Sequence, residues 1–237
     1  MNQQYNPDFV RELFDRMSSS YERVNYITSF GFSARWRRQM AEMIPQSNRP
    51  LKIIDLLTGM GESWSAIMNR FPNAELTALD FSTGMLVAAR AKNARRFQNR
   101  VIITQRDALQ SDIPSSSFDI ITCSFGLKTF SKDQVRRLAE ETYRILKPGG
   151  RFSFIEISGP PNRLLYSLYA FYLGRVIPLF GRLLLGNPVE YRMLWKYTLA
   201  FGSVSEAADV FSEIGFTVEK RSFFFGCATG FSGMKPS

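Results

Sequence analysis

Glycines and carboxylates alternate in the stretch IIDLLTGMGESW, which runs from residue 53 to residue 64. Gly59 and Gly61 allow the backbone to turn tightly and to approach a ligand without a Cβ clash. Asp55 and Glu62 place a negative charge on each side of these glycines. A carboxylate at the start of a helix repels phosphate and favours a cation. The loop therefore suits a ligand whose end near the glycines is positively charged.

Polar and small side chains also end the apolar runs that follow this loop. Asp80 comes about 20 residues after the glycines, where a carboxylate can accept hydrogen bonds from ribose hydroxyls. Asp107 ends the next run and is followed by Ala108, which suits the edge of an adenine ring, and Ser124 ends the run after that. An adenosine that carries an ammonium and a sulfonium meets all these requirements, so the predicted cofactor is S-adenosylmethionine.

These side chains need a scaffold that brings the ends of several strands together. Apolar β-type runs alternate with helical patterns, which predicts a parallel sheet covered on both faces. In such sheets ligands bind beyond the carboxyl ends of the strands, where the strand order reverses. The expected fold is α/β and Rossmann-like: a doubly wound, mostly parallel seven-stranded sheet with an N-terminal helical cap and a helical insertion after the fifth strand. The predicted strands cover 51–57, 74–80, 100–107, 118–126 and 151–158, then a pair at 216–226 and 228–235, and the predicted helices cover Glu62–Phe71, Thr83–Phe97, Lys132–Leu146 and Val204–Ile214.

A chain of 237 residues is long enough for one sizeable core, so a single domain is expected. Within it we predict a helical cap (1–50), a cofactor-binding core (51–158), a helical insertion (159–203) and a C-terminal helix with a strand pair (204–237). The insertion is rich in Leu, Tyr and Phe with interspersed Arg. It could be a lid over the acceptor, a face of a homodimer or a contact with a membrane surface, and the lid is preferred.

Composition excludes several classes of protein. The chain has no histidine, which excludes Ser-His-Asp and Cys-His catalysis and histidine-based metal sites, and no metal is expected. Two cysteines are too few for a disulfide framework. The net charge of +9 could attract nucleic acid, but no nucleic-acid-binding motif accompanies the basic clusters, so that partner is not expected. A polar N-terminus and the lack of an apolar run of ~20 residues predict a cytoplasmic location.

Several stretches recur in the order of a known family: FDRMSSSYERVN, WRRQM, DLLTGMGE, LDFSTGML, RDALQSDIPSSSFDIITCSFGL, YRILKPGGRFSFIEIS and, more faintly, YRMLWKY and FSEIGF. With them the chain resembles the class I methyltransferases, specifically the UbiE-type C-methyltransferases of ubiquinone and menaquinone biosynthesis. The resemblance implies an enzyme that transfers the methyl group of S-adenosylmethionine to a small, largely apolar or aromatic acceptor. The predicted cofactor-binding residues are Asp55, Thr58, Gly59, Gly61, Asp80, Phe81, Asp107, Ala108 and Ser124.

Departures from the family pattern fall mainly on the acceptor side. The family's T-G-T-G-D is Thr58-Gly59-Met60-Gly61-Glu62 here, and its Arg-Asn pair after Phe-Gly-Ile/Leu is Lys128-Thr129. The C-terminal H-x-G-x-K pattern lacks its histidine. Lysine cannot copy the bidentate contacts of arginine. The departures favour a relative that acts on another small molecule over a true quinone methyltransferase. The acceptor classes that we consider are a quinone precursor and a specialised metabolite.

Four residues are candidates for a proton transfer that accompanies methyl transfer: Tyr21, Lys128, Glu156 and Tyr191. Lys128 follows a strand end and could act as a base or as an anchor for an anion. Glu156 lies near the end of the fifth strand, where pairing with an arginine is the structural alternative. Tyr21, in the cap, and Tyr191, in the insertion, are implied by the resemblance.

Two other uses of the same fold stay open. The cofactor's own amino group could attack intramolecularly and release methylthioadenosine, because the acceptor motifs are altered. A protein without turnover could instead bind the cofactor, or could bind RNA through its positive charge.

Overall fold

The computed structural model describes residues 3–18, 29–176 and 189–237. Seven strands form one sheet in the order β3-β2-β1-β4-β5-β7-β6, in which β1 to β5 run parallel and β7 runs antiparallel to both neighbours. The predicted seven-stranded, mostly parallel sheet is thereby confirmed. The strands are β1 (Lys52–Leu56), β2 (Glu75–Asp80), β3 (Val101–Gln105), β4 (Phe118–Ser124), β5 (Leu146–Ile157), β6 (Thr217–Phe223) and β7 (Ala228–Met234).

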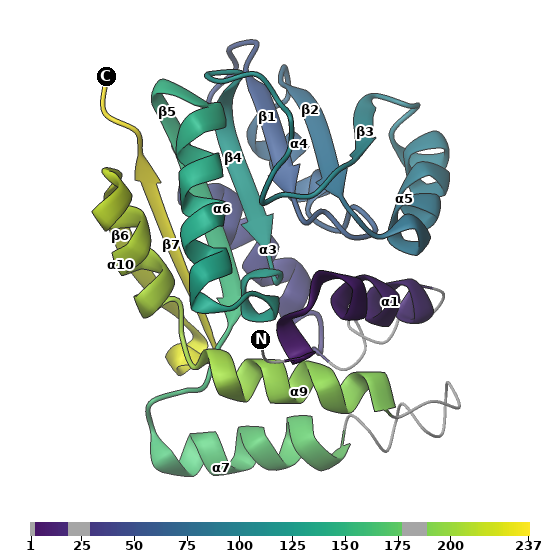
Figure 1. Cartoon of the computed structure of the whole chain (residues 1–237), viewed down its shortest axis with the longest axis vertical. Helices are drawn as coiled ribbons and strands as arrows, with labels where there is room; N and C mark the ends of the chain where they lie inside the picture. Colours follow the sequence, from purple (N-terminus) through teal and green to yellow (C-terminus); the bar gives the residue numbers. More distant parts are fainter. Residues whose placement is uncertain (1–2, 19–28, 177–188) are drawn as a thin grey trace.

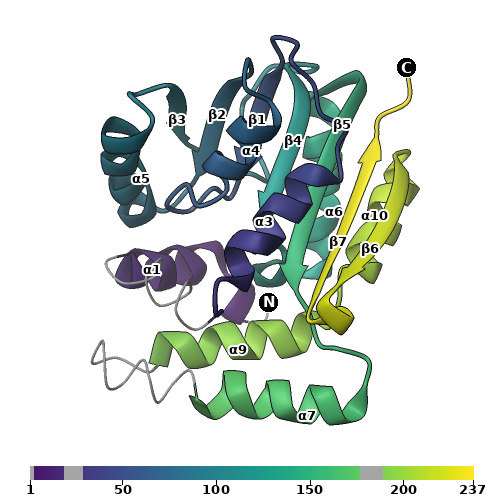
Figure 2. The ribbon, with the colours of Figure 1, turned by 180° about the vertical axis from the view of Figure 1, so that it is seen from behind.

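Helices cover both faces of the sheet, as Figures 1 and 2 show from opposite sides. One face carries α6 and α10, and the other carries α3, α4 and α5, which matches the two buried clusters of apolar side chains. The helices of these layers are α3 (Phe32–Glu42), α4 (Trp64–Arg70), α5 (Thr83–Arg96), α6 (Lys132–Ile145) and α10 (Ser205–Ile214). Coverage on both sides explains why the central strands read as continuous apolar runs.

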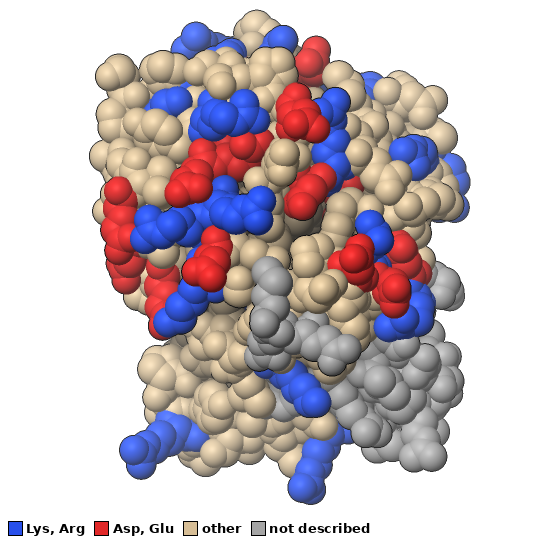
Figure 3. Space-filling view, viewed as in Figure 1, with Lys and Arg blue, Asp and Glu red and all other residues tan. Residues whose placement is uncertain are grey.

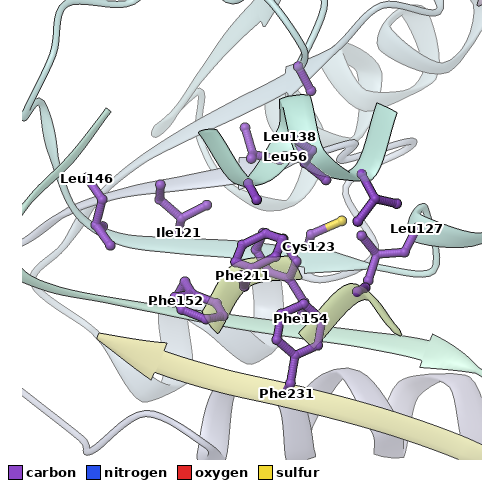
Figure 4. Packing of buried hydrophobic residues seen from close by; sticks show 14 of the residues in the cluster. Leu56, Ile121, Cys123, Leu127, Leu138, Leu146, Phe152, Phe154, Phe211 and Phe231 are labelled. Atoms are coloured by element: carbon purple, nitrogen blue, oxygen red, sulfur yellow. The ribbon is translucent and has the colours of Figure 1, made fainter. Parts of the chain in front are cut away.

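The larger core cluster is built from aromatic side chains on β5, β7 and α10. Phe152 and Phe154 of β5 pack against Phe211 and Phe231, with ring centroids 5.0–5.6 Å apart (Figure 4). Full burial of one such side chain contributes about 1.5–3 kcal/mol. Cys123 of β4 lies in the same cluster and is fully buried, so it packs as a small core residue.

Several element boundaries differ from the sequence prediction, among them the start of β5 and the start of α4. The helix predicted to end at Leu146 ends at Ile145, because Leu146 pairs with Phe118 and begins β5. Residues 147–150 (KPGG) therefore lie inside the strand, at a register shift, where the amide of Gly149 donates to the carbonyl of Lys235. The helix predicted from Glu62 begins at Trp64, so Glu62 belongs to the loop before it.

Among the described helices, those that lie across the carboxyl-end edge of the parallel strands are α1 (Pro7–Met17), α7 (Arg163–Phe171) and α9 (Val189–Phe201). In the segment before α1, the carbonyl of Tyr5 accepts from the side chain of Gln134 on α6, and the carbonyl of Gln4 accepts from the hydroxyl of Tyr197 on α9. The N-terminal segment and the insertion thus meet over the strand ends. Within the described parts of the chain, no helix combines the length and the apolar character needed to span a membrane.

Candidate active site

The loop between β1 and α4 lies at the position where the strand order reverses. Gly59 and Gly61 have φ angles of 57° and 77°, in the left-handed region that favours glycine. A Cβ atom added to Gly61 would lie 2.5 Å from the ring of Trp64, so the loop packs directly on this indole. Glycine at position 61 is therefore needed both for the turn and for the close packing behind it.

Asp55 lies beneath this loop rather than in contact with the cleft. Its carboxylate is buried and accepts from the hydroxyls of Thr58 at 2.6 Å and Thr122 at 2.8 Å. The Thr58 hydroxyl also accepts from the indole N–H of Trp64 at 2.8 Å. Burial raises the pKa of Asp55 to about 6. Asp55 thus acts on the cleft by orienting Thr58, because no atom of the carboxylate reaches the lining.

Asp80, the last residue of β2, faces the cleft. One carboxylate oxygen accepts from the amide of Gly59 at 2.8 Å and the other from the amide of Ser82 at 2.9 Å. The side chain therefore joins the glycine loop to the start of α5. Burial, the largest influence, raises its pKa to about 6, although these amide hydrogen bonds lower it.

The cleft encloses about 830 Å³ of space free of protein atoms, its open mouth included. Seven of the nine predicted cofactor-binding residues line it, and Asp55 and Gly61 do not. The seven are Thr58, Gly59, Asp80, Phe81, Asp107, Ala108 and Ser124. The remaining walls are mostly apolar. They come from the N-terminal segment with α1 and from the loop after β4, with single residues after β1, on α5 and after β3: Tyr5, Pro7, Val10, Phe14, Leu57, Met85, Leu109, Phe125 and Phe130.

Arg37, which is buried, and Glu62, which is partly buried, form a pair of opposite charges on the wall of the cleft. Glu62 entered the sequence argument for a cationic ligand, but neither residue was among the predicted cofactor-binding residues. Their closest approach, Nη2 to Oε1, is 3.7 Å, too long for a hydrogen bond. Arg37 also lies over the ring of Phe125, 4.8 Å from its centroid. Within the described chain, neither Arg37 Nε nor Glu62 Oε1 has a hydrogen-bond partner. The sequence did contain a signal for Arg37, since this residue belongs to the stretch WRRQM, which is part of the resemblance to the family.

Lys128 and Glu156 form a second buried pair, behind the cleft wall. The ammonium of Lys128 lies 2.8 Å from a Glu156 oxygen and 2.5 Å from the carbonyl of Phe125. The other Glu156 oxygen accepts from the Lys128 amide at 3.1 Å. Both side chains are buried, and neither is part of the lining. The structural alternative for Glu156 was pairing with an arginine, and the residue with which it pairs is Lys128.

This second pair holds a strained stretch of backbone. Phe125 has a φ angle of 63°, which is uncommon for a bulky residue, and it lines the cleft. Its carbonyl is fixed by Lys128 and its amide donates to Ile155 on β5 at 2.9 Å. The pair therefore determines where the Phe125 ring stands.

The two tyrosines predicted to take part in catalysis cannot be placed at the cleft. Tyr21 lies outside the described residues, and Tyr191 lies on α9 with a side chain outside the described part.

Asp15, within the quoted stretch FDRMSSSYERVN, attaches the cap to the core. Its carboxylate accepts from the hydroxyl of Ser82 at 2.5 Å and from the amide of Gly84 at 2.8 Å, at the first turn of α5. A Cβ atom on Gly84 would lie 3.1 Å from the Asp15 backbone, so the two helices are in close contact. Ser82 in turn donates its amide to Asp80, and the cap is thereby tied to the cleft.

The fold corresponds to that of solved methyltransferases. A methyltransferase from Haloferax volcanii, solved in complex with a methyltransferase activator, superposes with a TM-score of 0.67 at 17% identity, covering 94% of this chain and 98% of that one. Phosphoethanolamine N-methyltransferase 2 of Haemonchus contortus, solved with S-adenosyl-L-methionine, gives a TM-score of 0.62 at 14% identity, covering 94% of this chain and 60% of that one. The molecule thus has the Rossmann-like fold of the class I methyltransferases.

Sequence comparison narrows this class to one family. The sequence model of the ubiE/COQ5 methyltransferase family matches residues 1–235. The demethylmenaquinone methyltransferase of Thermus thermophilus is 34% identical over 225 residues, covering 94% of this chain and 100% of that protein. The protein of the same name from Thermotoga maritima is 35% identical over 223 residues, covering 93% of each. The chain belongs to the ubiE/COQ5 methyltransferase family and is an S-adenosylmethionine-dependent methyltransferase, as predicted.

Proposed function

We propose that the cleft holds S-adenosylmethionine with the methionine end at Arg37 and Glu62. The unpartnered Nε of Arg37 and Oε1 of Glu62 support this, because an amino acid carries a carboxylate for one and an ammonium for the other. Asp80 accepts from the ribose hydroxyls, and Asp107 with Ala108 receives the adenine edge. Thr58, Gly59, Phe81 and Ser124 complete the contacts, and Asp55 and Gly61 position them.

The acceptor occupies the apolar part of the cleft, between α1 and the loop after β4. Its lining is aromatic and aliphatic, with Tyr5, Val10, Phe14, Phe125 and Phe130. Such a surface fits a flat, apolar ring better than a charged metabolite. We therefore propose a quinone precursor or a related aromatic compound as the acceptor class, in line with the names of the relatives.

When bound, the cofactor supplies an electrophilic methyl group on its sulfonium. The residues of this chain contribute mainly by holding the two reactants in line and by excluding water. An acceptor carbon or oxygen must also lose its proton. Lys128 and Glu156 are engaged with each other, so we propose that they position Phe125 rather than take this proton. Tyr21 and Tyr191 stay candidates for that role.

The test of this function is the fate of the cofactor. Purified protein with S-adenosylmethionine and a demethylated naphthoquinol should yield S-adenosylhomocysteine and the acceptor with one added methyl group, identified by mass spectrometry. Without acceptor, neither product should accumulate. Methylthioadenosine without any methylated acceptor would support intramolecular cyclisation and would overturn methyl transfer. Tight cofactor binding with no product from a panel of aromatic acceptors would contradict the acceptor class.

Cofactor affinity is expected to depend on pH near 6. Burial raises the pKa of Asp80 from 3.8 to about 6, and a ribose hydroxyl donates best to the ionised carboxylate. The dissociation constant should therefore rise as pH falls below about 6, by up to roughly tenfold per pH unit for this one proton, and should level off above it. Titration calorimetry on both sides of pH 6 measures this slope. In Asp80→Asn this part of the pH dependence of the dissociation constant should disappear. A pH dependence equal to that of the unsubstituted protein would contradict the assignment of Asp80 to the cofactor site.

The raised pKa of Asp80 favours the folded state at low pH, whereas it weakens cofactor binding at low pH. Because the folded pKa lies above the unfolded value of 3.8, the folded state keeps this proton longer than the unfolded state does. The contribution of Asp80 to the free energy of unfolding is therefore greatest below pH 3.8 and decreases as pH rises through about 6.

The remaining predictions on partners concern the insertion 159–203. We propose that α1 and α9 together close the cleft over the acceptor, supported by the contact of Tyr197 with the N-terminal segment. The homodimer and the cytoplasmic location stay predictions.

A further inference from the structure

Helix α7 carries a stripe of apolar side chains that point away from the protein. Leu164, Leu168 and Phe171 are spaced as one face of a helix and are 72%, 60% and 57% exposed. The neighbouring face of α7 packs inward, where Leu165 and Tyr169 contact the core. No residue of α7 is fully buried. A helix with one apolar face packed and a second one exposed has more apolar surface than the fold of a single chain requires.

Two exposed phenylalanines lie at the ends of this stripe. At the start of α7, the 3₁₀ turn η4 (Phe224–Gly226) contacts Pro161, because a Cβ atom on Gly226 would lie 2.6 Å from the proline ring. Phe225 in this turn is 78% exposed and has a φ angle of 55°, a strained conformation for an aromatic residue. Beyond the end of α7, Phe30 is also 78% exposed and stacks on Tyr172. The apolar surface thus extends past both ends of the helix.

The charged side chains described on the insertion are basic. Residues 159–203 contain five basic residues and one acidic residue, Glu190. Arg163, Arg175 and Lys196 are exposed on the described part of the insertion. Figure 3 shows the same contrast for the described residues: around α7 and α9 the coloured surface is tan with isolated blue side chains and no red on this face, whereas red and blue mix over the part of the molecule above. Apolar side chains flanked by arginine and lysine are the pattern of a segment that lies in a membrane interface.

We propose that the surface formed by α7, Phe225 and Phe30 docks on an anionic phospholipid bilayer, with the apolar side chains in the interface and the basic residues at the headgroups. A symmetric dimer through this face would bring the basic side chains of two copies together, which makes a second copy the weaker occupant. The bilayer has the complementary charge and an apolar interior. Because α9 joins this surface to the cap over the cleft, docking brings the acceptor side of the enzyme to the lipid. The proposal stands apart from the chemistry in the cleft, since lipid binding is measurable without cofactor or acceptor.

The test is cosedimentation of the full chain with vesicles of phosphatidylcholine alone and of phosphatidylcholine mixed with phosphatidylglycerol. Binding is expected to the mixed vesicles only and should weaken as salt is raised. Leu168→Glu should bind roughly tenfold to a hundredfold more weakly, because it removes one side chain from the interface. Val87→Glu is the matched control, since Val87 on α5 is also 60% exposed but lies away from this surface. Arg163→Glu should weaken binding, and Arg90→Glu on α5 should not.

Three outcomes would overturn the proposal. One is no binding to the mixed vesicles at low salt. Another is equal loss in Leu168→Glu and Val87→Glu, which would point to a general effect of added charge. The third is a dimer in light scattering that Leu168→Glu converts to a monomer, which would assign the stripe to a second copy. Unchanged melting temperature and cofactor affinity in each variant establish that a loss of vesicle binding does not come from unfolding.

Discussion

Asp80→Ala is expected to weaken the binding of S-adenosylmethionine by at least about a hundredfold. The ionised carboxylate that lines the cleft can accept from two ribose hydroxyls, and a hydrogen bond to a charged group contributes about 1.5–3 kcal/mol. The variant also frees the amide of Gly59, which the carboxylate fixes at 2.8 Å, so the glycine loop loses its link to β2. Titration calorimetry with the cofactor measures the change.

The fold should withstand this substitution. A buried carboxylate with a raised pKa contributes little net stability, because desolvation opposes its hydrogen bonds. Urea denaturation should therefore show a loss well below that of a core truncation. Glu75→Ala is the control, since it removes an exposed carboxylate from the other end of the same strand and should leave the affinity unchanged. Unchanged affinity in Asp80→Ala would refute the cofactor site.

Glu156→Gln is expected to lower the free energy of unfolding by about 3–5 kcal/mol, because it leaves the buried ammonium of Lys128 without its counter-charge. Both residues are buried, and their mutual distance is 2.8 Å. The double variant Lys128→Met/Glu156→Leu removes both charges and should be less destabilised than the single variant. Urea denaturation at one pH compares the three proteins.

The activity of the double variant separates positioning from proton transfer. If the pair only holds the Phe125 backbone, acceptor KM should change more than kcat, and the pH profile of kcat should keep its shape. Loss of kcat with an altered pH profile would instead support the earlier prediction that Lys128 or Glu156 moves a proton. Asp119→Asn is the control, since it breaks a partly exposed pair with Lys147 and should cost under about 1 kcal/mol.

The fold was predictable because its signals are local. Buried parallel strands require continuous apolar runs, and the helices between them show their own period, so each type of element can be read from a short window. Ser131 with Gln134 forms the capping box that begins α6, a signal contained in four residues. The start of β5 was missed, since Leu146 is a strand residue only because it pairs with Phe118, and no local pattern carries that partnership.

In the candidate site, local signals were sufficient for the residues at the strand ends but not for the charged pairs. Asp80, Asp107 and Ser124 follow strand ends, and strand ends of a parallel sheet meet at one edge whatever the loops do. Arg37 and Glu62 were missed as a pair because they come from different elements, α3 and the loop before α4, and only packing brings them together. Lys128 looked like a free base because sequence cannot show that Glu156, 28 residues further along, lies against it.

By itself, then, the sequence determined the sheet, the cofactor and the family, since these depend on residue types at fixed spacing. The tertiary structure decided which charged groups are available for chemistry. It buries Asp55 and the Lys128–Glu156 pair behind the cleft, it leaves one buried atom each of Arg37 and Glu62 without a hydrogen-bond partner among the described residues, and it exposes an apolar face on α7. The physical reason is that the availability of a charge depends on desolvation and on partners that are distant in sequence, and both arise only when the chain has folded.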